Sequence, residues 1–144
     1  MSVFTTHELA FLGAGREAGG QGNLARLATA GKDGTPHVVP VGIWTHNPVE
    51  DTIDVRGRGL ERTAKFRNVK RTGRAAIVID DLVDLTPAEA ETAGGWTSRP
   101  RAIEIRGRAE ALTNGEGLIR IHPERIISWG TDADHPTQRN ARNV

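Results

Sequence analysis

Short apolar segments bounded by turn-forming residues most limit what this chain can fold into. Within most of them apolar and polar side chains alternate, as in β-strands that bury one face. The longest is AIEIRGRAEAL at residues 102–112. The other segments with strand character cover residues 23–29, 36–44, 52–56, 75–79, 118–121 and 125–129. Six or seven short strands with little helix predict an all-β domain, closed into a barrel so that few strand edges stay exposed.

The first two of these segments predict a hairpin. Lys32-Asp33-Gly34 is a tight-turn signal between residues 23–29 and 36–44. Pro40 lies inside the second strand and has no N–H to donate to a ladder, so we expect this strand at an edge or a bulge. The run at residues 75–79 is apolar throughout, which predicts a strand buried on both faces.

Helices are expected at few places. Thr5 and Glu8 form a capping-box pattern, which predicts a short helix to about Gly13. Residues 60–71 read as a short, basic helix. Residues 81–101 are expected to be a long connection with one helical turn, and residues 131–144 a polar tail over the surface. The 144 residues fit one domain, 1–144, in which residues 1–21 are the N-terminal helix and a glycine-rich lead-in.

The sequence lacks the motifs that are typical of several classes of function. The chain has no cysteine, and its five histidines never pair at metal-ligand spacing, so we expect no metal site. No G-x-S-x-G elbow is present, and the glycine-rich stretch does not follow a strand, which argues against a dinucleotide fingerprint. Nucleic-acid binding would need clustered aromatic side chains for base stacking, and these are absent. The first twenty residues lack the pattern of a signal peptide, so we predict a cytoplasmic protein.

Positive charge is concentrated between residues 56 and 74, although the net charge of the chain is only +1. This cluster favours an anionic ligand bound at one place; a solvated helix face is the alternative. The residues concerned are Arg56, Arg58, Arg62, Lys65, Arg67, Lys70, Arg71 and Arg74.

Three ordered segments resemble the pyridoxamine 5′-phosphate oxidase-like split-barrel superfamily. They are ATAGKDGTPHVVPVGIW; Arg58-Gly59 with TAKFRN and Gly73-Arg74-Ala75; and IEIRGRAEAL followed by RIHPERIISWG. Within it the sequence is most similar to the actinobacterial coenzyme F420-dependent oxidoreductases, a branch that includes reductases of tetracycline-type antibiotic biosynthesis. The resemblance implies a six-stranded antiparallel split barrel with Greek-key character, a homodimer, and a cofactor site at the subunit interface.

The resemblance also implies a function and a set of residues. Hydride transfer from reduced coenzyme F420 to an unsaturated organic acceptor is expected. An FMN-binding oxidase or reductase, or a non-catalytic cofactor or haem-fragment binder, is the alternative. The catalytic residues stay unknown. The cofactor-binding positions that it implies are Val39, Pro40, Val41, Arg56, Arg58, Gly59, Thr63, Lys65 and Trp129.

Each of these positions has a specific expected role. Thr63 and Lys65, with Arg58 and Gly59, fall where the cofactor phosphate binds, and residues 38–42 fall against the cofactor ring. Ala64 departs from the oxidases, which have an arginine there, so Arg58, Arg56 or Arg62 must compensate. Trp129 matches a position that reaches the cofactor, or else packs in the dimer core. Arg139 and Arg142 could fold over the phosphates, although a disordered tail is the preferred interpretation.

Overall fold

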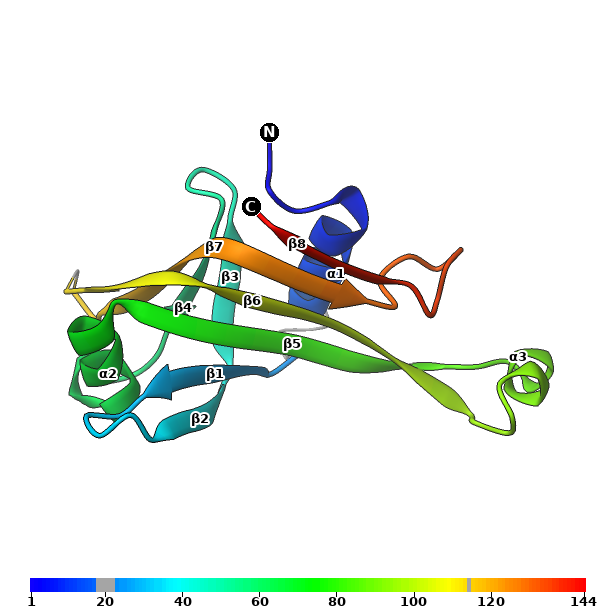
Figure 1. The fold of residues 1–144 in the computed structure, drawn as a ribbon, viewed down its shortest axis with the longest axis horizontal. Helices are drawn as coiled ribbons and strands as arrows, with labels where there is room; N and C mark the ends of the chain where they lie inside the picture. The colour runs from blue at the N-terminus through cyan, green and yellow to red at the C-terminus, as the bar shows by residue number, and fades with distance from the viewer. Residues whose placement is uncertain (18–22, 114) are drawn as a thin grey trace.

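A computed structural model describes residues 1–17, 23–113 and 115–144, and it shows one curled antiparallel sheet (Figure 1). The strands pair in the order β2-β1-β5-β6-β7-β4-β3, and β8 pairs with β7. Their bounds are β1 Ala25–Ala30, β2 Pro36–Val41, β3 Ile43–Asn47, β4 Thr52–Arg56, β5 Arg74–Asp84, β6 Ser98–Leu112, β7 Leu118–Trp129 and β8 Arg139–Asn143. The two end strands of the seven-strand path, β2 and β3, are separated in sequence by Gly42 alone, so the sheet must curl until its ends meet there.

This arrangement is the predicted split barrel, with eight strands rather than six. Most neighbouring strands are consecutive in sequence, but β4 pairs with β7 and β1 pairs with β5, as expected of Greek-key character. The core fills the inside of the curl with side chains from alternate strand positions. Fully buried examples are Trp44, Leu27, Ile77, Ile79, Ile103, Ile105, Ile119, Ile121 and Ile126.

Two predicted strand boundaries are wrong, for local reasons. Residues 36–44 form not one strand but two, because the chain leaves one end of the sheet at Gly42 and joins the other end. Residues 118–121 and 125–129 are one strand, β7, which continues through Pro123. Pro123 is tolerated because it faces Gly107 at a register shift, where a β-carbon on Gly107 would lie 1.9 Å from the carbonyl oxygen of His122.

The expected long connection at residues 81–101 begins and ends as paired strand. Strands β5 and β6 stay paired from Asp80↔Ala102 out to Asp84↔Ser98, well beyond the core. The short helix α3 (Pro87–Thr92) sits at the tip, begun by a capping box between Thr86 and Glu89. Figure 1 shows this hairpin, residues 80–102, projecting from the barrel; we call it the arm. Its paired ends, DDLVD and SRPRA, lack the alternation of apolar and polar residues that predicts a strand, and this concealed the ladder, because backbone pairing does not require such alternation.

The remaining helices begin at side-chain caps. Helix α1 (Thr6–Glu17) starts at the predicted Thr5–Glu8 capping box and runs past Gly13. The predicted helix at residues 60–71 is divided by Thr63 into a 3₁₀ turn, η1 (Leu60–Arg62), and helix α2 (Ala64–Thr72). Most of the predicted glycine-rich lead-in lies outside the described residues. In the described ranges, no helix combines the length and the apolar character needed to span a membrane.

Candidate functional site

The start of helix α2 is held in place by its own side chains. Thr63 accepts a hydrogen bond from the Phe66 amide and donates one to the Leu60 carbonyl at 2.6 Å. Phe66 and Val69 are buried in the core, and the Asn68 amide nitrogen donates to Thr29 on β1. These contacts fix the orientation of the N-terminal end of α2. The hydroxyl of Thr63 is engaged in capping, so what this end offers a ligand is its backbone N–H groups and Lys65 in the first turn.

Positive side chains lie before and along helix α2 without an acidic partner in the described part of the chain. Among the described residues, no ion pair involves the cations that we call the basic segment: Arg56, Arg58, Arg62, Lys65, Arg67, Lys70 and Arg71. Arg67 and Arg71 donate to backbone carbonyls, and Arg71 also to Asn68. By contrast Arg74, which the sequence grouped with them, pairs with Glu124. Lys70 and Arg71 lie in the last turn of α2, so the cations beside its N-terminus are Arg58, Arg62 and Lys65. Cations without an ion-pair partner beside a helix N-terminus attract an anion.

A hollow of about 300 Å³ opens beside the basic segment. Gly59 and Arg62 line it from the η1 side, and Gly115 and Glu116 from the β6–β7 turn. Gly59 has φ of +63°, in the left-handed region that favours glycine. Glu61 and Glu116 also line the hollow, and their carboxylates disfavour an anionic group there.

The strand expected against the cofactor ring, β2, divides its side chains between two faces. Val41 is buried and Val39 packs partly buried against the core, so these two valines fill the barrel. Val38 and Pro40 point outward, and Val38 is 68% exposed. Because β2 is an edge strand, every second residue keeps its backbone polar groups off the β1 ladder. Pro40 and those backbone groups, rather than the valine side chains, are what β2 offers to a ligand.

The outer face of the sheet carries a shallow hollow that the sequence did not reveal. Two adjoining depressions of about 240 and 410 Å³ share Ala28 and Ala76. These alanines pair directly across β1 and β5, and Val38 faces Ala28 from β2. The rim carries Arg26, Arg74, Arg106 and Glu104. The sequence feature that could have predicted this hollow is the small residues at outward-facing strand positions, because they leave room for a flat group or a second protein surface.

Trp129 does not meet helix α2 within one chain. It pairs with Ala102 and Arg139 at the far end of β7, and it is half-buried. Ile121 lies eight residues from Trp129 along β7 and is paired with Ala109 on β6. The Ala109 amide donates to the carbonyl of Gly73, the cap at the C-terminal end of α2. At ~3.3 Å per residue the separation between Ile121 and Trp129 is roughly 25 Å. Of the other predicted positions, Val39, Pro40 and Val41 lie on β2, and the rest run from the end of β4 into the start of α2. Within one chain Trp129 is therefore apart from the predicted positions on α2.

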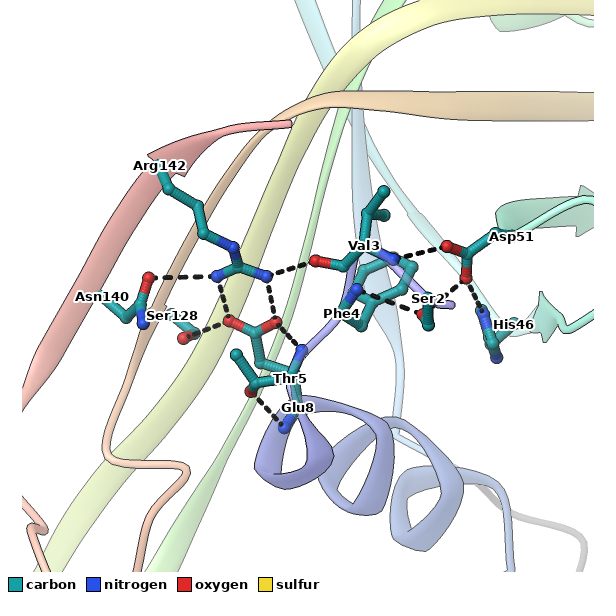
Figure 2. A network of polar contacts seen from close by, with 10 residues as sticks. All are labelled: Ser2, Val3, Phe4, Thr5, Glu8, His46, Asp51, Ser128, Asn140 and Arg142. Atoms are coloured by element: carbon teal, nitrogen blue, oxygen red, sulfur yellow. Dashed lines mark hydrogen bonds and ion pairs between the residues drawn. The ribbon is translucent and has the colours of Figure 1, made fainter.

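Arg142, one of the two C-terminal arginines, has partners within the fold. Figure 2 shows Arg142 on β8 in a two-pronged ion pair with Glu8 of α1, at 2.8 and 2.9 Å, and bonded to the Val3 carbonyl. Ser128 donates to the same carboxylate at 2.7 Å. We call Glu8, Ser128 and Arg142 the terminal clamp. Burial alone would raise the pKa of Glu8, but Arg142, Ser128 and Thr5 lower it below its usual value. The preferred interpretation of a disordered tail is therefore wrong, and Arg142 serves the fold.

No group of three or more His, Asp and Glu side chains in the described ranges is arranged to hold a metal ion. The polar chemistry of the site is thus carried by cations, backbone N–H groups and an edge strand. This set suits a ligand with a phosphate and a planar ring, because the phosphate needs cationic donors and the ring needs hydrogen-bonding backbone.

Comparisons with known proteins place the chain in a family. A family profile described as pyridoxamine 5′-phosphate oxidase matches residues 15–142. A 5a,11a-dehydrotetracycline/5a,11a-dehydrooxytetracycline reductase from Streptomyces rimosus is 37% identical over 150 residues, which cover 98% of this chain and 93% of the relative.

Solved structures show the same fold at low identity. The conserved hypothetical protein Rv2991 from Mycobacterium tuberculosis superposes with a TM-score of 0.61 at 18% identity, over 89% of this chain and 86% of that one. A heme binding protein from Mycobacterium smegmatis has a TM-score of 0.59 at 14% identity, over 99% and 60%. The profile match spans most of the chain, and the curated relative is a reductase. The chain therefore belongs to the pyridoxamine 5′-phosphate oxidase family, as an oxidoreductase with a split-barrel fold.

Proposed function

We propose that this protein is a reductase that transfers hydride from reduced coenzyme F420 to an unsaturated organic acceptor. The family supports a flavin-type cofactor, and the 37%-identical relative acts as a reductase on a dehydrotetracycline. The observation that carries the choice of cofactor is the basic segment. Its seven cations form no ion pair with any described residue, and they are spread along residues 56–71 rather than gathered at one point.

The residues present fit such a cofactor. The phosphate would lie at the N-terminus of α2, with Lys65 and Arg58 as charged donors, and the longer acidic tail would follow Arg56, Arg62 and Arg67. A bound deazaflavin supplies the hydride. The protein binds its tail, offers the edge of β2 to its ring, and excludes water once the outer face is covered.

The active form would be a homodimer. In one chain the hollow on the outer face is open, and Trp129 lies far from α2. A second copy on the outer face would cover the alanine-lined hollow and bring its own Trp129 to the site. Light scattering at micromolar concentration is expected to show a dimer; a monomer at that concentration would count against an interface site.

FMN is the competing cofactor, and one structural feature bears on the choice. FMN ends in a single phosphate and needs a compact group of donors, but Ala64 removes one donor at the start of α2 and Thr63 is engaged with Leu60. The fold alone does not distinguish FMN from coenzyme F420, because a heme binding protein shares this fold at 14% identity.

Side-by-side titration of the purified protein with coenzyme F420 and with FMN, at one salt concentration, tests the proposal. Coenzyme F420 is expected to bind at least tenfold more tightly, a difference of about 1.4 kcal/mol. Tighter FMN binding, or FMN that copurifies with the protein and colours it yellow, would overturn the deazaflavin assignment. A dehydrotetracycline, the substrate class of the relative, is the first acceptor to assay with the reduced cofactor.

A further inference from the structure

The arm continues the outer face of the barrel with apolar side chains. On β5, strand alternation puts Leu82 on the same side as Val78 and Ala76, and Leu82 pairs with Pro100 on β6. Leu82 is 70% exposed, and Pro100 is exposed as well. Asp80, which pairs with Arg26, lies between Val78 and Leu82 on this side of β5. Leu82 and Pro100 therefore form a separate apolar patch on the arm, and no described residue covers it.

The tip of the arm carries a second uncovered group, Trp96. Its side chain is 74% exposed, although the chain has only six aromatic residues and places Trp44 wholly in the core. Tryptophan has a large apolar surface and is enriched at contacts between proteins and with planar ligands. Leu82 and Trp96 together mark the arm as a binding element rather than a spacer.

Charge differs in sign between the two ends of the molecule. The arm beyond Asp81 carries three acidic residues, Asp84, Glu89 and Glu91, against one cation, Arg99. The basic segment carries seven cations, interrupted by Glu61. Figure 1 shows α3 and α2 at opposite ends of the long axis of the molecule.

Two copies that pack through their outer faces can have two relative orientations, which differ in the direction of the two-fold axis. If the axis runs along the strands, like ends meet and each acidic arm lies beside the other. If the axis crosses the strands, the copies are antiparallel and each acidic arm lies over the basic end of the other copy. Charge complementarity favours the antiparallel packing, because like charges disfavour the parallel one.

We infer that the two copies pack antiparallel through the outer face, and that the arm of each crosses the basic segment of the other. Trp96 then supplies an apolar wall to the cofactor site of the second copy. Three acidic groups against seven cations leave a positive excess for an anionic ligand. This inference rests on the homodimer of the proposed function and adds its orientation and a trans contribution to each site.

Cross-linking distinguishes the two packings, because the natural chain has no cysteine. The variants are Ala88→Cys on exposed α3, Lys70→Cys on exposed α2, and both together, each treated with a short bis-maleimide. The double variant is expected to run mainly as a covalent dimer under denaturing conditions, and each single variant as a monomer. Covalent dimers from Ala88→Cys alone would show arms side by side and overturn the inference.

The failures of the two proposals are separable. A dimer by light scattering with no cross-link in the double variant overturns the arm placement and leaves the homodimer standing. A monomer by light scattering overturns both. A second readout uses Trp96→Ala, which is expected to weaken cofactor binding at least fivefold while the urea midpoint stays unchanged, since the side chain is exposed. Unchanged cofactor affinity in Trp96→Ala would contradict the trans wall.

Charge reversal tests what sets the orientation. Asp84→Lys with Glu91→Lys is expected to raise the dimer dissociation constant at least tenfold at low salt, with a smaller effect at high salt. The matched control compares Glu91→Lys alone with Glu50→Lys, which makes the same change of net charge at an exposed residue away from the arm and is expected to have little effect. Equal effects of Glu91→Lys and Glu50→Lys would remove charge as the cause of the antiparallel packing.

Discussion

The terminal clamp and the basic segment are both rich in charge but use it in opposite ways. In the clamp the Glu8 side chain is fully buried, and its carboxylate takes hydrogen bonds from Arg142, Ser128 and the Thr5 amide. In the basic segment seven cations stand at the surface without an acidic partner in the described residues. A charge that is matched within the chain holds the fold, whereas an unmatched cluster is available to something outside it.

The two regions also differ in what builds them. The clamp joins residues 134 positions apart in sequence, and it closes β8 and α1 over the end of the barrel. The basic segment is nearly contiguous and is shaped locally by the caps at Gly59 and Thr63. Substitutions in the first should therefore change stability, and substitutions in the second should change ligand affinity. The following predictions test that division.

The largest effect is expected for Arg142→Ala. It leaves the buried Glu8 carboxylate without its cation, a change that costs about 3–5 kcal/mol of unfolding free energy. Urea denaturation measures it. The matched control is Arg74→Ala, which breaks an exposed pair with Glu124 and should cost at most about 1 kcal/mol. Similar losses for both variants would mean that the clamp is no more important than a surface ion pair.

Lys65→Ala is expected to act on the ligand rather than the fold. Loss of one charge-assisted hydrogen bond should weaken cofactor binding by roughly 1.5–3 kcal/mol, with the urea midpoint nearly unchanged. Lys70→Ala on the same helix is the control and should change affinity little. If both substitutions weaken binding equally, the basic segment acts as a diffuse field and the phosphate assignment to Lys65 is wrong.

Acid should weaken the paired region. The pKa of Glu8 is below its reference of 4.5, and the Arg120, Asn47 and Thr52 hydrogen bonds hold the pKa of Asp54 below 3.8 although burial raises it. Carboxyls with lowered folded-state pKa values stabilise the protein fully above their unfolded pKa, and this stability is lost as pH falls through the folded values. Unfolding free energy should therefore be level above pH 4.5 and fall below it. A decline already present between neutral pH and 4.5 would point to other groups.

The smallest effect expected is that of salt. Cofactor affinity should fall gradually as ionic strength rises, because the basic segment attracts an anionic tail through exposed, screened charges. The unfolding free energy contributed by the buried clamp should change less over the same range, which can be measured as the difference between the natural protein and Arg142→Ala. Salt-independent cofactor binding would show that the basic segment is ordinary surface.

Sequence patterns predicted what depends on neighbouring residues. The Thr5–Glu8 capping box, the Lys32–Gly34 turn and the edge position of the strand that contains Pro40 are all confirmed, since each follows from the local preferences of a few residues. Ordered motifs, taken together, also predicted the family and the split barrel, and the density of cations indicated where to look for an anionic ligand.

What the sequence alone determined is thus local: caps, turns, strand periodicity and a contiguous run of positive charge, each set by residues close together in the chain. Only the tertiary structure decided the partners of charges far apart in sequence. It separated Trp129 from α2, matched Arg142 with Glu8, and carried β5 and β6 out as an arm. These outcomes depend on register and on the curl of the sheet, because pairing across strands brings together residues whose spacing in sequence carries no periodic signal.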